Sequence, residues 1–213
     1  MVPNAHSQIS ALVNPAAGSG RGARVLPLVK AALKASFPAA EIQVIATQSR
    51  EHIFELGRSV KADLLLCVGG DGSVHDLAQT LISRPASQRP ALAFIPVGSG
   101  NDYARTLGMP LEPLAALHAL RDCQLVQVDV GKVNDRYFLE TLSFGADAAV
   151  ALKTEEMRLT SKERGTRLYT RAAINTIIHD LVQHKAHCRI GEQSFECEFL
   201  IFAVQNGPTY GSG

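Results

Sequence analysis

Leu64-Leu65-Leu66-Cys67-Val68-Gly69-Gly70-Asp71-Gly72-Ser73 is the stretch from which the fold can be predicted. Its first five residues are all apolar, which is typical of a parallel strand that is covered on both faces. Two glycines, an Asp, a third glycine and a hydroxyl residue follow, and helical spacing begins at Val74. Glycines let the backbone approach a phosphate closely, and a helix N-terminus offers free N–H groups and the positive end of its dipole. The stretch therefore predicts a phosphate-binding turn between a buried strand and a helix.

We assign the reactive role in this turn to the side chain of Asp71. A carboxylate at this position acts either through a bound Mg²⁺ ion or by accepting a proton from an attacking hydroxyl group. A simpler interpretation makes Asp71 or Ser73 the cap of the helix. A cap alone requires neither of the paired glycines, so we prefer the functional interpretation.

Two other glycine-rich turns also follow predicted strands. Pro96-Val97-Gly98-Ser99-Gly100-Asn101-Asp102 opens a helix, and its glycines permit close backbone contact while its Ser and Asn offer hydrogen bonds. Asp102 could equally be an N-cap. Asn14–Gly22 is not a P-loop, because GxxxxGK followed by Ser or Thr is absent, and its third glycine is misplaced for a dinucleotide fingerprint. This last segment fits a phosphate loop and a flexible turn equally well, but three such turns together favour a phosphate-rich ligand.

Strand and helix patterns alternate along the first part of the chain. This alternation predicts an α/β fold with a parallel sheet flanked by helices, whose ligands bind beyond the carboxyl ends of the strands. The expected strands are Ile9–Val13, Glu41–Ala46, Leu64–Val68 and Ala91–Ile95. The expected helices are Val25–Phe37, Arg50–Lys61, Val74–Ile82, Asn101–Leu107 and Leu114–Leu120.

The pattern changes near residue 128, where we place a domain boundary. Residues 1–128 form the expected nucleotide-binding domain, and residues 129–213 form a second, β-rich and sandwich-like domain with one helix. Its expected strands are Val126–Val133, Arg136–Leu142, Ala186–Ile190 and Phe195–Val204, and its expected helix is Thr166–Gln183. These strands are too few to close a sandwich, and the last residues have a turn sequence directly after a strand. We therefore expect this second domain to be incomplete.

Composition excludes several classes of protein. The net charge of the 213 residues is +1, whereas a nucleic-acid-binding domain is usually strongly basic. No apolar run approaches the roughly 18 residues of a membrane span, and Met1–Asn4 lacks the features of a signal peptide. Four cysteines without a CxxC pair fit no zinc pattern and suit a reducing cytoplasm. Lys153–Arg171 has six Lys or Arg against three Glu; a solvated helix face explains it better than contact with anionic lipid.

At its glycine-rich turns the chain resembles the diacylglycerol kinase catalytic-domain family, which includes sphingosine kinases and bacterial YegS-like lipid kinases. Asn14-Pro15 resembles the family's first motif, Gly69–Ser73 its GGDGT motif, and Pro96–Asp102 its PxGTxND motif. Ser replaces the usual Thr in both of the latter motifs and keeps the hydroxyl group. Further similarities follow in the family's order at Asp129–Gly131, Arg136–Phe138, Ser143–Ala148, Asn206-Gly207 and Tyr210-Gly211.

The resemblance implies ATP as the phosphoryl donor, Mg²⁺ as cofactor and a lipid hydroxyl as acceptor. It implies a catalytic role for Asp71 and acceptor-side roles for Asp102 and Asp147. The implied nucleotide contacts are Asn14, Thr47, Gly69, Gly70, Asp71, Gly72, Ser73, Val74, His75, Gly98, Ser99 and Asn101. The family's metal ligands lie beyond the Asn206-Gly207 turn and are not assigned here. The presumed substrate implies a cytoplasmic protein that meets the inner membrane surface peripherally, while the oligomeric state is not readable.

Two other functions fit parts of the same pattern. NAD kinases also use a GGDGT motif, although Gly98–Asp102 fits the lipid-kinase pattern better. A non-catalytic nucleotide-binding module is the other alternative, and the incomplete second domain favours it.

Overall fold

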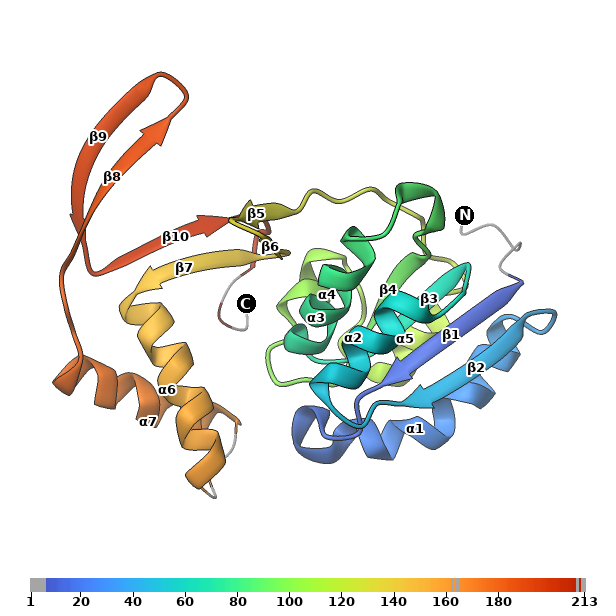
Figure 1. Ribbon diagram of the computed structural model, residues 1–213. Helices are drawn as coiled ribbons and strands as arrows, with labels where there is room; N and C mark the ends of the chain where they lie inside the picture. The colour runs from blue at the N-terminus through green and yellow to red at the C-terminus, as the bar shows by residue number, and fades with distance from the viewer. Residues whose placement is uncertain (1–6, 162, 164, 210, 212–213) are drawn as a thin grey trace. The chain divides into compact units, whose positions relative to one another are not determined.

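The computed structural model describes residues 7–161, 163, 165–209 and 211. The first part of the chain forms a parallel sheet with the strand order β2-β1-β3-β4 (Figure 1). The strands are β1 (Gln8–Val13), β2 (Glu41–Ala46), β3 (Leu64–Gly69) and β4 (Ala91–Pro96). The expected α/β fold with a helix-flanked parallel sheet is confirmed, because each strand and each helix expected before residue 121 is present.

Helices cover both faces of this sheet. One core cluster joins α1 (Ala17–Ser36) and α5 (Pro113–Ala119) to one face, and a second joins α2 (Arg50–Ser59) and α3 (Asp71–Ile82) to the other. β3 shows why its sequence is continuously apolar: Leu64, Leu66 and Val68 belong to the first cluster, whereas Leu65 and Cys67 belong to the second. All six residues of this strand are buried, as a central parallel strand requires.

The order of the strands determines where a ligand can bind. The chain leaves β1 towards β2 on one side and then crosses to β3 on the other side of β1. The carboxyl ends of β1 and β3 thus form a topological switch point, which is the usual position of the ligand in an open α/β sheet. Val13 and Val68 lie opposite each other in the register, so the turns that follow them begin at the same edge.

By packing, the chain divides into two compact units, Met1–Glu140 with Asn206–Gly213, and Thr141–Gln205. The first unit also contains η1 (Ala86–Gln88), α4 (Asp102–Thr106), and the antiparallel hairpin of β5 (Gly131–Val133) and β6 (Arg136–Phe138). The side-chain amide of Gln79 on α3 bonds the backbone of Tyr137 twice, at 2.7 and 3.0 Å. This hairpin follows residue 128 in sequence but packs within the first unit.

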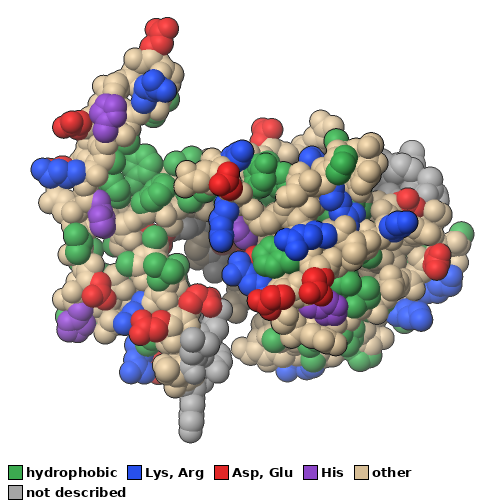
Figure 2. Space-filling model, viewed as in Figure 1, with side chains coloured by type: hydrophobic (Ala, Val, Ile, Leu, Met, Phe, Trp, Pro, Cys, Tyr) green, Lys and Arg blue, Asp and Glu red, His purple; other side chains and the backbone are tan. Residues whose placement is uncertain are grey.

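The second unit is rich in antiparallel strands. β7 (Thr141–Gly145) pairs with β10 (Ile201–Gln205), and β8 (His184–Ile190) pairs with β9 (Gln193–Phe199). Two helices, α6 (Ala146–Thr160) and α7 (Gly165–His179), lie between β7 and β8 in the chain. Apolar side chains gather on the surface near the base of the β8–β9 hairpin (Figure 2). The exposed apolar residues of this unit include Phe144 on β7, Phe195 on β9 and Ile201 on β10.

The basic stretch of the second unit contains ion pairs on the helix surfaces. Lys153 contacts Glu156 at 3.0 Å and Arg171 contacts Glu163 at 3.4 Å. Lys162 and Arg164 of this stretch lie outside the described residues, as does Tyr210 of the C-terminal motif. Throughout the described part of the chain, no helix combines the length and apolar character that a bilayer crossing needs.

Four expectations about individual elements were wrong. The expected strand Arg136–Leu142 is divided between β6 and β7, which join different ladders. Only Gly131–Val133 of the expected strand Val126–Val133 is extended in a ladder, since the preceding residues are exposed and pair with no strand. The sequence analysis missed α6, although it is rich in Ala, Leu, Lys and Glu, which favour helices. The expected strand Phe195–Val204 is broken at Leu200, so that β9 and β10 join different ladders.

We expect Leu66→Ala to lower the free energy of unfolding by about 2–5 kcal/mol, because it leaves a cavity in the fully buried centre of the sheet. Leu28→Ala on α1 is the matched control, since 46% of Leu28 is exposed, and it should cost less than about 1 kcal/mol. Urea denaturation followed by circular dichroism measures both values. Equal losses for the two variants would contradict the assignment of the core.

Candidate functional site

The glycine-rich turn after β1 packs against the turn after β4. Gly18, Ser19 and Gly20 have φ values of 57°, 55° and 89°, so the first turn of α1 is irregular. A Cβ atom on Gly18 would overlap the carbonyl oxygen of Val97. The absence of a side chain at Gly18 therefore allows two turns that lie far apart in the sequence to touch.

The turns after β3 and β4 touch each other through their backbones. The Val97 amide donates to the Gly69 carbonyl oxygen at 2.8 Å. A Cβ atom on Gly98 would lie 2.6 Å from the Cα atom of Gly70. This distance is below any ordinary contact, and a backbone atom cannot move away as a side chain can. Gly98 is therefore required for the two turns to lie together at the edge of the sheet, while a Cβ atom on Gly70 would lie 3.2 Å from the Cα atom of Gly98, a tight contact.

The carboxylate of Asp71 fixes the start of α4. One oxygen accepts the amide of Asn101 at 2.7 Å, and the other accepts the amide of Tyr103 at 3.1 Å. The Asn101 side chain in turn closes its own loop, because it accepts from the Gly98 amide at 2.9 Å and donates to the Gly98 carbonyl at 3.0 Å. Asn101 is buried and has φ 59°, a left-handed conformation that Asn tolerates better than most residues. These bonds lock the GGDGS and GSGND turns into one structure.

Asn14 connects the first turn to the start of α3. Its amide donates to the Val68 carbonyl at 2.9 Å, and its side-chain nitrogen donates to the Ser73 hydroxyl at 3.0 Å. Ser73 is buried at the beginning of α3, whose N-cap residue Gly70 supplies no side-chain acceptor. The N–H groups of this first helical turn lie at the switch-point edge of the sheet, where the positive end of the helix dipole favours an anion.

The other predicted nucleotide contacts occupy different environments. Thr47 is buried beside β1, with its amide and its hydroxyl both donating to the Val13 carbonyl, at 2.8 and 3.2 Å. Val74 is buried in the hydrophobic core, so only its backbone can face a ligand. His75 is half-buried, and this burial lowers its pKa, against the opposing effect of Asp76. Ser99 is exposed at the tip of its turn.

An ion pair stabilises the adjoining ends of α2 and α3. Arg50 donates to both carboxylate oxygens of Asp76, each at 2.7 Å. The Asp76 side chain is 10% exposed, whereas Arg50 reaches the surface with 60% of its side chain exposed. This two-bond geometry is stronger and more directional than a single contact.

The two predicted acceptor-side residues lie in different compact units. Asp102 begins α4 in the first unit, where its carbonyl oxygen accepts the Thr209 hydroxyl at 3.0 Å. Asp147 lies in the first turn of α6 in the second unit. The pKa of Tyr169 is raised mainly by burial and, to a smaller extent, by the charge of Asp147. Asp71 and Asp102 therefore share a unit, and Asp147 belongs to the other.

Glu140 is a residue of this region that the sequence analysis missed. Its carbonyl oxygen accepts the amides of Asn206 and Gly207 at 2.7 and 3.3 Å. Burial raises the pKa of its carboxyl group, and the charges of Asp102 and Asp71 raise it further. No glycine or motif marks this residue in the sequence, since only folding brings it near the two aspartates.

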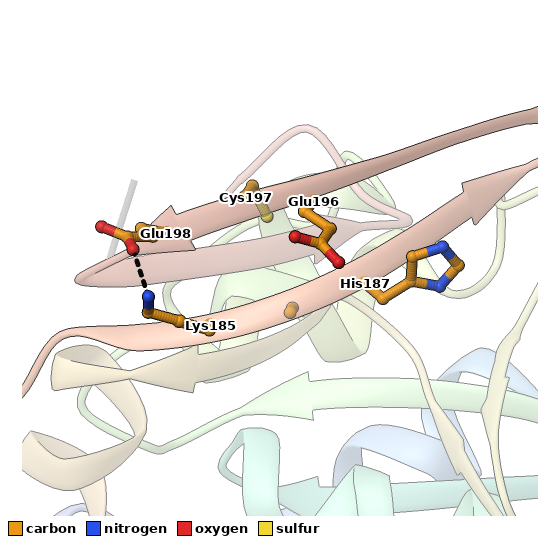
Figure 3. Close-up of a pocket in the computed structure, with 6 residues that line it drawn as sticks. Lys185, His187, Glu196, Cys197 and Glu198 are labelled. Atoms are coloured by element: carbon orange, nitrogen blue, oxygen red, sulfur yellow. Dashed lines mark ion pairs between the residues drawn. The ribbon is translucent and has the colours of Figure 1, made fainter.

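A hollow of about 290 Å³ lies elsewhere, on one face of the β8–β9 hairpin. Figure 3 shows Lys185 and Glu198 joined across the hairpin by an ion pair of 2.8 Å, with Glu196 and His187 further along the strands. Its lining comes from two exposed strands of the second unit alone and includes none of the glycine-rich turns. We therefore define the candidate site by the strand ends of the first unit.

Acidic side chains, His and Cys are the residues that could hold a metal ion in this protein. Over the residues that the structure describes, no three His, Cys, Asp or Glu side chains are grouped so as to hold a metal ion. Both Asp71 oxygens already accept backbone amides. Among the described residues, the side chains thus do not form a ready Mg²⁺ site.

Comparison with known families identifies the family of the chain. A family model described as the diacylglycerol kinase catalytic domain matches residues 8–133, which include β1 to β5 and all three glycine-rich turns. The chain belongs to the diacylglycerol kinase catalytic-domain family. The resemblance inferred from the motifs is thereby confirmed.

Individual proteins with similar sequences have names that are consistent with this family. The chain is 32% identical over 146 residues to a diacylglycerol kinase of Staphylococcus epidermidis, an alignment that covers 67% of this chain and 45% of that protein. It is 34% identical over 151 residues to a Pseudomonas aeruginosa protein named probable lipid kinase YegS-like, covering 70% of this chain and 47% of the relative. The chain thus spans about half the length of these relatives.

A solved structure shows the same similarity in three dimensions. The crystal structure of a diacylglycerol kinase from Bacillus anthracis matches with a TM-score of 0.74 and 28% sequence identity. The match covers 96% of this chain and 66% of that one. The fold of this family member therefore agrees with that of a solved relative over nearly all of its residues.

In this diacylglycerol kinase family member, we expect Gly98→Ala to be destabilising even without ligand. The new Cβ atom would lie 2.6 Å from Gly70 Cα and 2.9 Å from Asn101 Oδ1, so the two turns must separate. A loss of roughly 1–3 kcal/mol in the free energy of unfolding is expected, as for overpacking. Gly72→Ala is the control, because a Cβ atom there meets nothing within 4 Å. Denaturant titration of both variants decides the matter, and an unchanged Gly98→Ala protein would disprove the close contact.

Proposed function

We propose that the protein is an ATP-dependent lipid kinase that transfers the γ-phosphate to a lipid hydroxyl group. The observation that carries the proposal is the meeting of three glycine-rich turns at the switch-point edge of the sheet, where Gly70 and Gly98 touch. Such a surface of backbone amides suits a chain of phosphates, which needs close approach and positive dipoles rather than an apolar pocket. Membership of the diacylglycerol kinase family supports the choice of reaction.

In this proposal, backbone groups of the turns hold the nucleotide. The first turn of α3, Asp71 to Ser73, faces the phosphates, and Gly70 and Gly98 leave room for them beside the backbone. Thr47, His75 and Ser99 complete the nucleotide contacts. Since phosphoryl transfer depends mostly on positioning and on stabilising charge, a rigid cradle supplies a large part of the catalysis.

Asp71 is proposed as the catalytic residue, with a second role in the structure. Its two hydrogen bonds to the α4 backbone hold the carboxylate in one orientation at the start of α3. From there it would accept the proton of the attacking hydroxyl group. Asp102, next to the same bonds, is proposed to face the acceptor.

Asp147 in the second unit is also proposed to contact the acceptor. A lipid acceptor would bring the protein to a membrane surface as a peripheral, cytoplasmic enzyme. The diacylglycerol kinase and lipid kinase names of the relatives support a lipid as the acceptor class. The experiment below identifies the headgroup and the chain of the lipid acceptor.

The first experiment offers several acceptors to the chain at once. The protein is incubated with γ-labelled ATP, Mg²⁺, a total lipid extract and NAD, and the products are separated by chromatography. Label in the lipid fraction supports the proposal, and the labelled spot identifies the acceptor. Label in NAD would replace it by an NAD kinase, while nucleotide binding without transfer would indicate a binding module.

We expect Asp71→Asn to reduce transfer by about 10²–10⁴-fold, because an amide cannot accept the proton. It should also lower the free energy of unfolding by about 1–3 kcal/mol, since the amide offers one acceptor oxygen where two backbone amides need partners. Label transfer and thermal denaturation measure the two effects. Asp135→Asn, in the exposed turn between β5 and β6, is the control and should match the wild type. Full activity of Asp71→Asn would exclude Asp71 as the base.

A further inference from the structure

Glu140 is an ionisable residue of the first unit that the proposed reaction does not use. Both of its carboxyl oxygens are shielded from solvent, and the Thr106 hydroxyl lies beside them. A Cβ atom on Gly207 would overlap the Oε2 atom, so the carboxyl group lies directly against this glycine. A carboxylate in such a place is costly unless a proton or another charge compensates it.

The segment that follows β10 holds this carboxyl group in position. Asn206 donates through its backbone to the Glu140 carbonyl at 2.7 Å, and its side chain donates to the carbonyls of Asp129 and Leu139, both at 2.8 Å. Two residues after Gly207, the Thr209 hydroxyl bonds the Asp102 carbonyl at 3.0 Å and contacts the Thr106 hydroxyl at 3.1 Å. The segment from 206 to 209 therefore ties Glu140 to α4, whose start is fixed by Asp71.

The groups that face Glu140 are acidic or neutral. Burial raises its pKa most, and the carboxylates of Asp102 and Asp71 add to this, whereas the nearby Thr106 hydroxyl acts in the opposite direction. Tyr103 on α4 is affected in turn, since its pKa is raised by burial and by the charge of Glu140. The charge of Glu140 is thus coupled to the two aspartates of the candidate site and to Tyr103 on α4.

We propose that Glu140 is a positioning residue of the phosphate site. When its carboxyl group is ionised, Glu140 adds one negative charge beside Asp71 and Asp102, and when the group carries a proton, that charge is withheld. The proposal rests on the proposed function, because it assumes that the site binds a nucleotide. With the proton in place, the site presents two carboxylates to the phosphates. Without it, a third carboxylate repels them, and nucleotide affinity falls.

The direction of the pH dependence follows from the raised pKa. Because the folded protein holds this proton more tightly than the unfolded chain, Glu140 makes the protein less stable as pH rises from 4.5 through the pKa in the folded state. Glu140→Gln carries no charge at any pH and is free of this loss. The difference in Tm between Glu140→Gln and wild type should therefore increase across this interval and remain constant above it.

The first measurement uses the protein without nucleotide. Thermal denaturation of wild type and Glu140→Gln is followed from pH 4 to pH 8, and the Tm difference should grow by about 2–4 °C in favour of Glu140→Gln. Glu41→Gln is the control, because Glu41 is exposed at the start of β2, and its Tm should follow the wild type throughout. Glu140→Asp keeps an ionisable group and should retain the dependence if Glu140→Gln does not fold.

The second measurement is nucleotide binding by isothermal titration with ATP and Mg²⁺ over the same pH range. The proton equilibrium of ATP itself cancels in the ratio of wild-type to Glu140→Gln dissociation constants. This ratio should be near one at pH 4.5 and should rise to about threefold to tenfold at pH 8, the effect of one additional charge near the phosphates. A merely structural role for Glu140 would give a ratio that does not change with pH.

The two measurements separate the failure of this inference from the failure of the proposed function. A Tm difference that does not change with pH overturns the role of the Glu140 proton, whatever the nucleotide result. A changing Tm difference with a constant ratio of dissociation constants overturns its connection to the site. If neither protein binds ATP at any pH, the proposed function is wrong, and so is the proposed effect of Glu140 on nucleotide binding. The Tm result would still show whether the buried carboxyl group of Glu140 takes up a proton.

Discussion

The backbone contact between Gly70 and Gly98 is the constraint on which the candidate site depends. Two turns from neighbouring strands lie so close that Gly98 has no space for a side chain in front of Gly70, and a side chain on Gly70 would be tightly packed against Gly98. Parallel pairing of β3 with β4 brings the turns to the same edge, and the bond from Val97 to Gly69 extends the ladder into them. The result is a surface of main-chain atoms at the point where an α/β sheet binds its ligand.

Polar side chains keep this surface in one conformation. Asp71 bonds the turn after β4, Asn101 closes that turn internally, and Asn14 joins the turn after β1 to Ser73. Each of these residues belongs to a motif that sequence reasoning assigned to nucleotide binding. In the structure they first satisfy backbone groups, which would otherwise be left unpaired in a turn of irregular geometry. Structural and functional interpretations of such motifs are therefore not alternatives, because a rigid phosphate site requires both.

The return of the chain after β10 adds a second feature to the site. Asn206 and Gly207 bind the backbone of Glu140, and Thr209 reaches α4. The first unit is thus completed by residues that come more than sixty positions later in the chain. This return packs against Glu140, whose pKa is raised by burial and further by the charges of Asp102 and Asp71.

The sequence by itself determined the parallel sheet, its helices and the family. Buried strands such as Leu64–Gly69 are continuously apolar, and the turns after them must contain glycine, so both features are written locally. The strand expected at Val126–Val130 was wrong, because an apolar run does not show whether a partner strand exists. The helix Ala146–Thr160 was missed, because a local sequence does not show whether pairing as a strand will compete with a helix. Only the tertiary structure decided that Gly18 lies against Val97, that Asp71 holds α4, and that Glu140 approaches two aspartates. Those contacts join residues distant in the chain, and their energies depend on distance and burial, which no local pattern encodes.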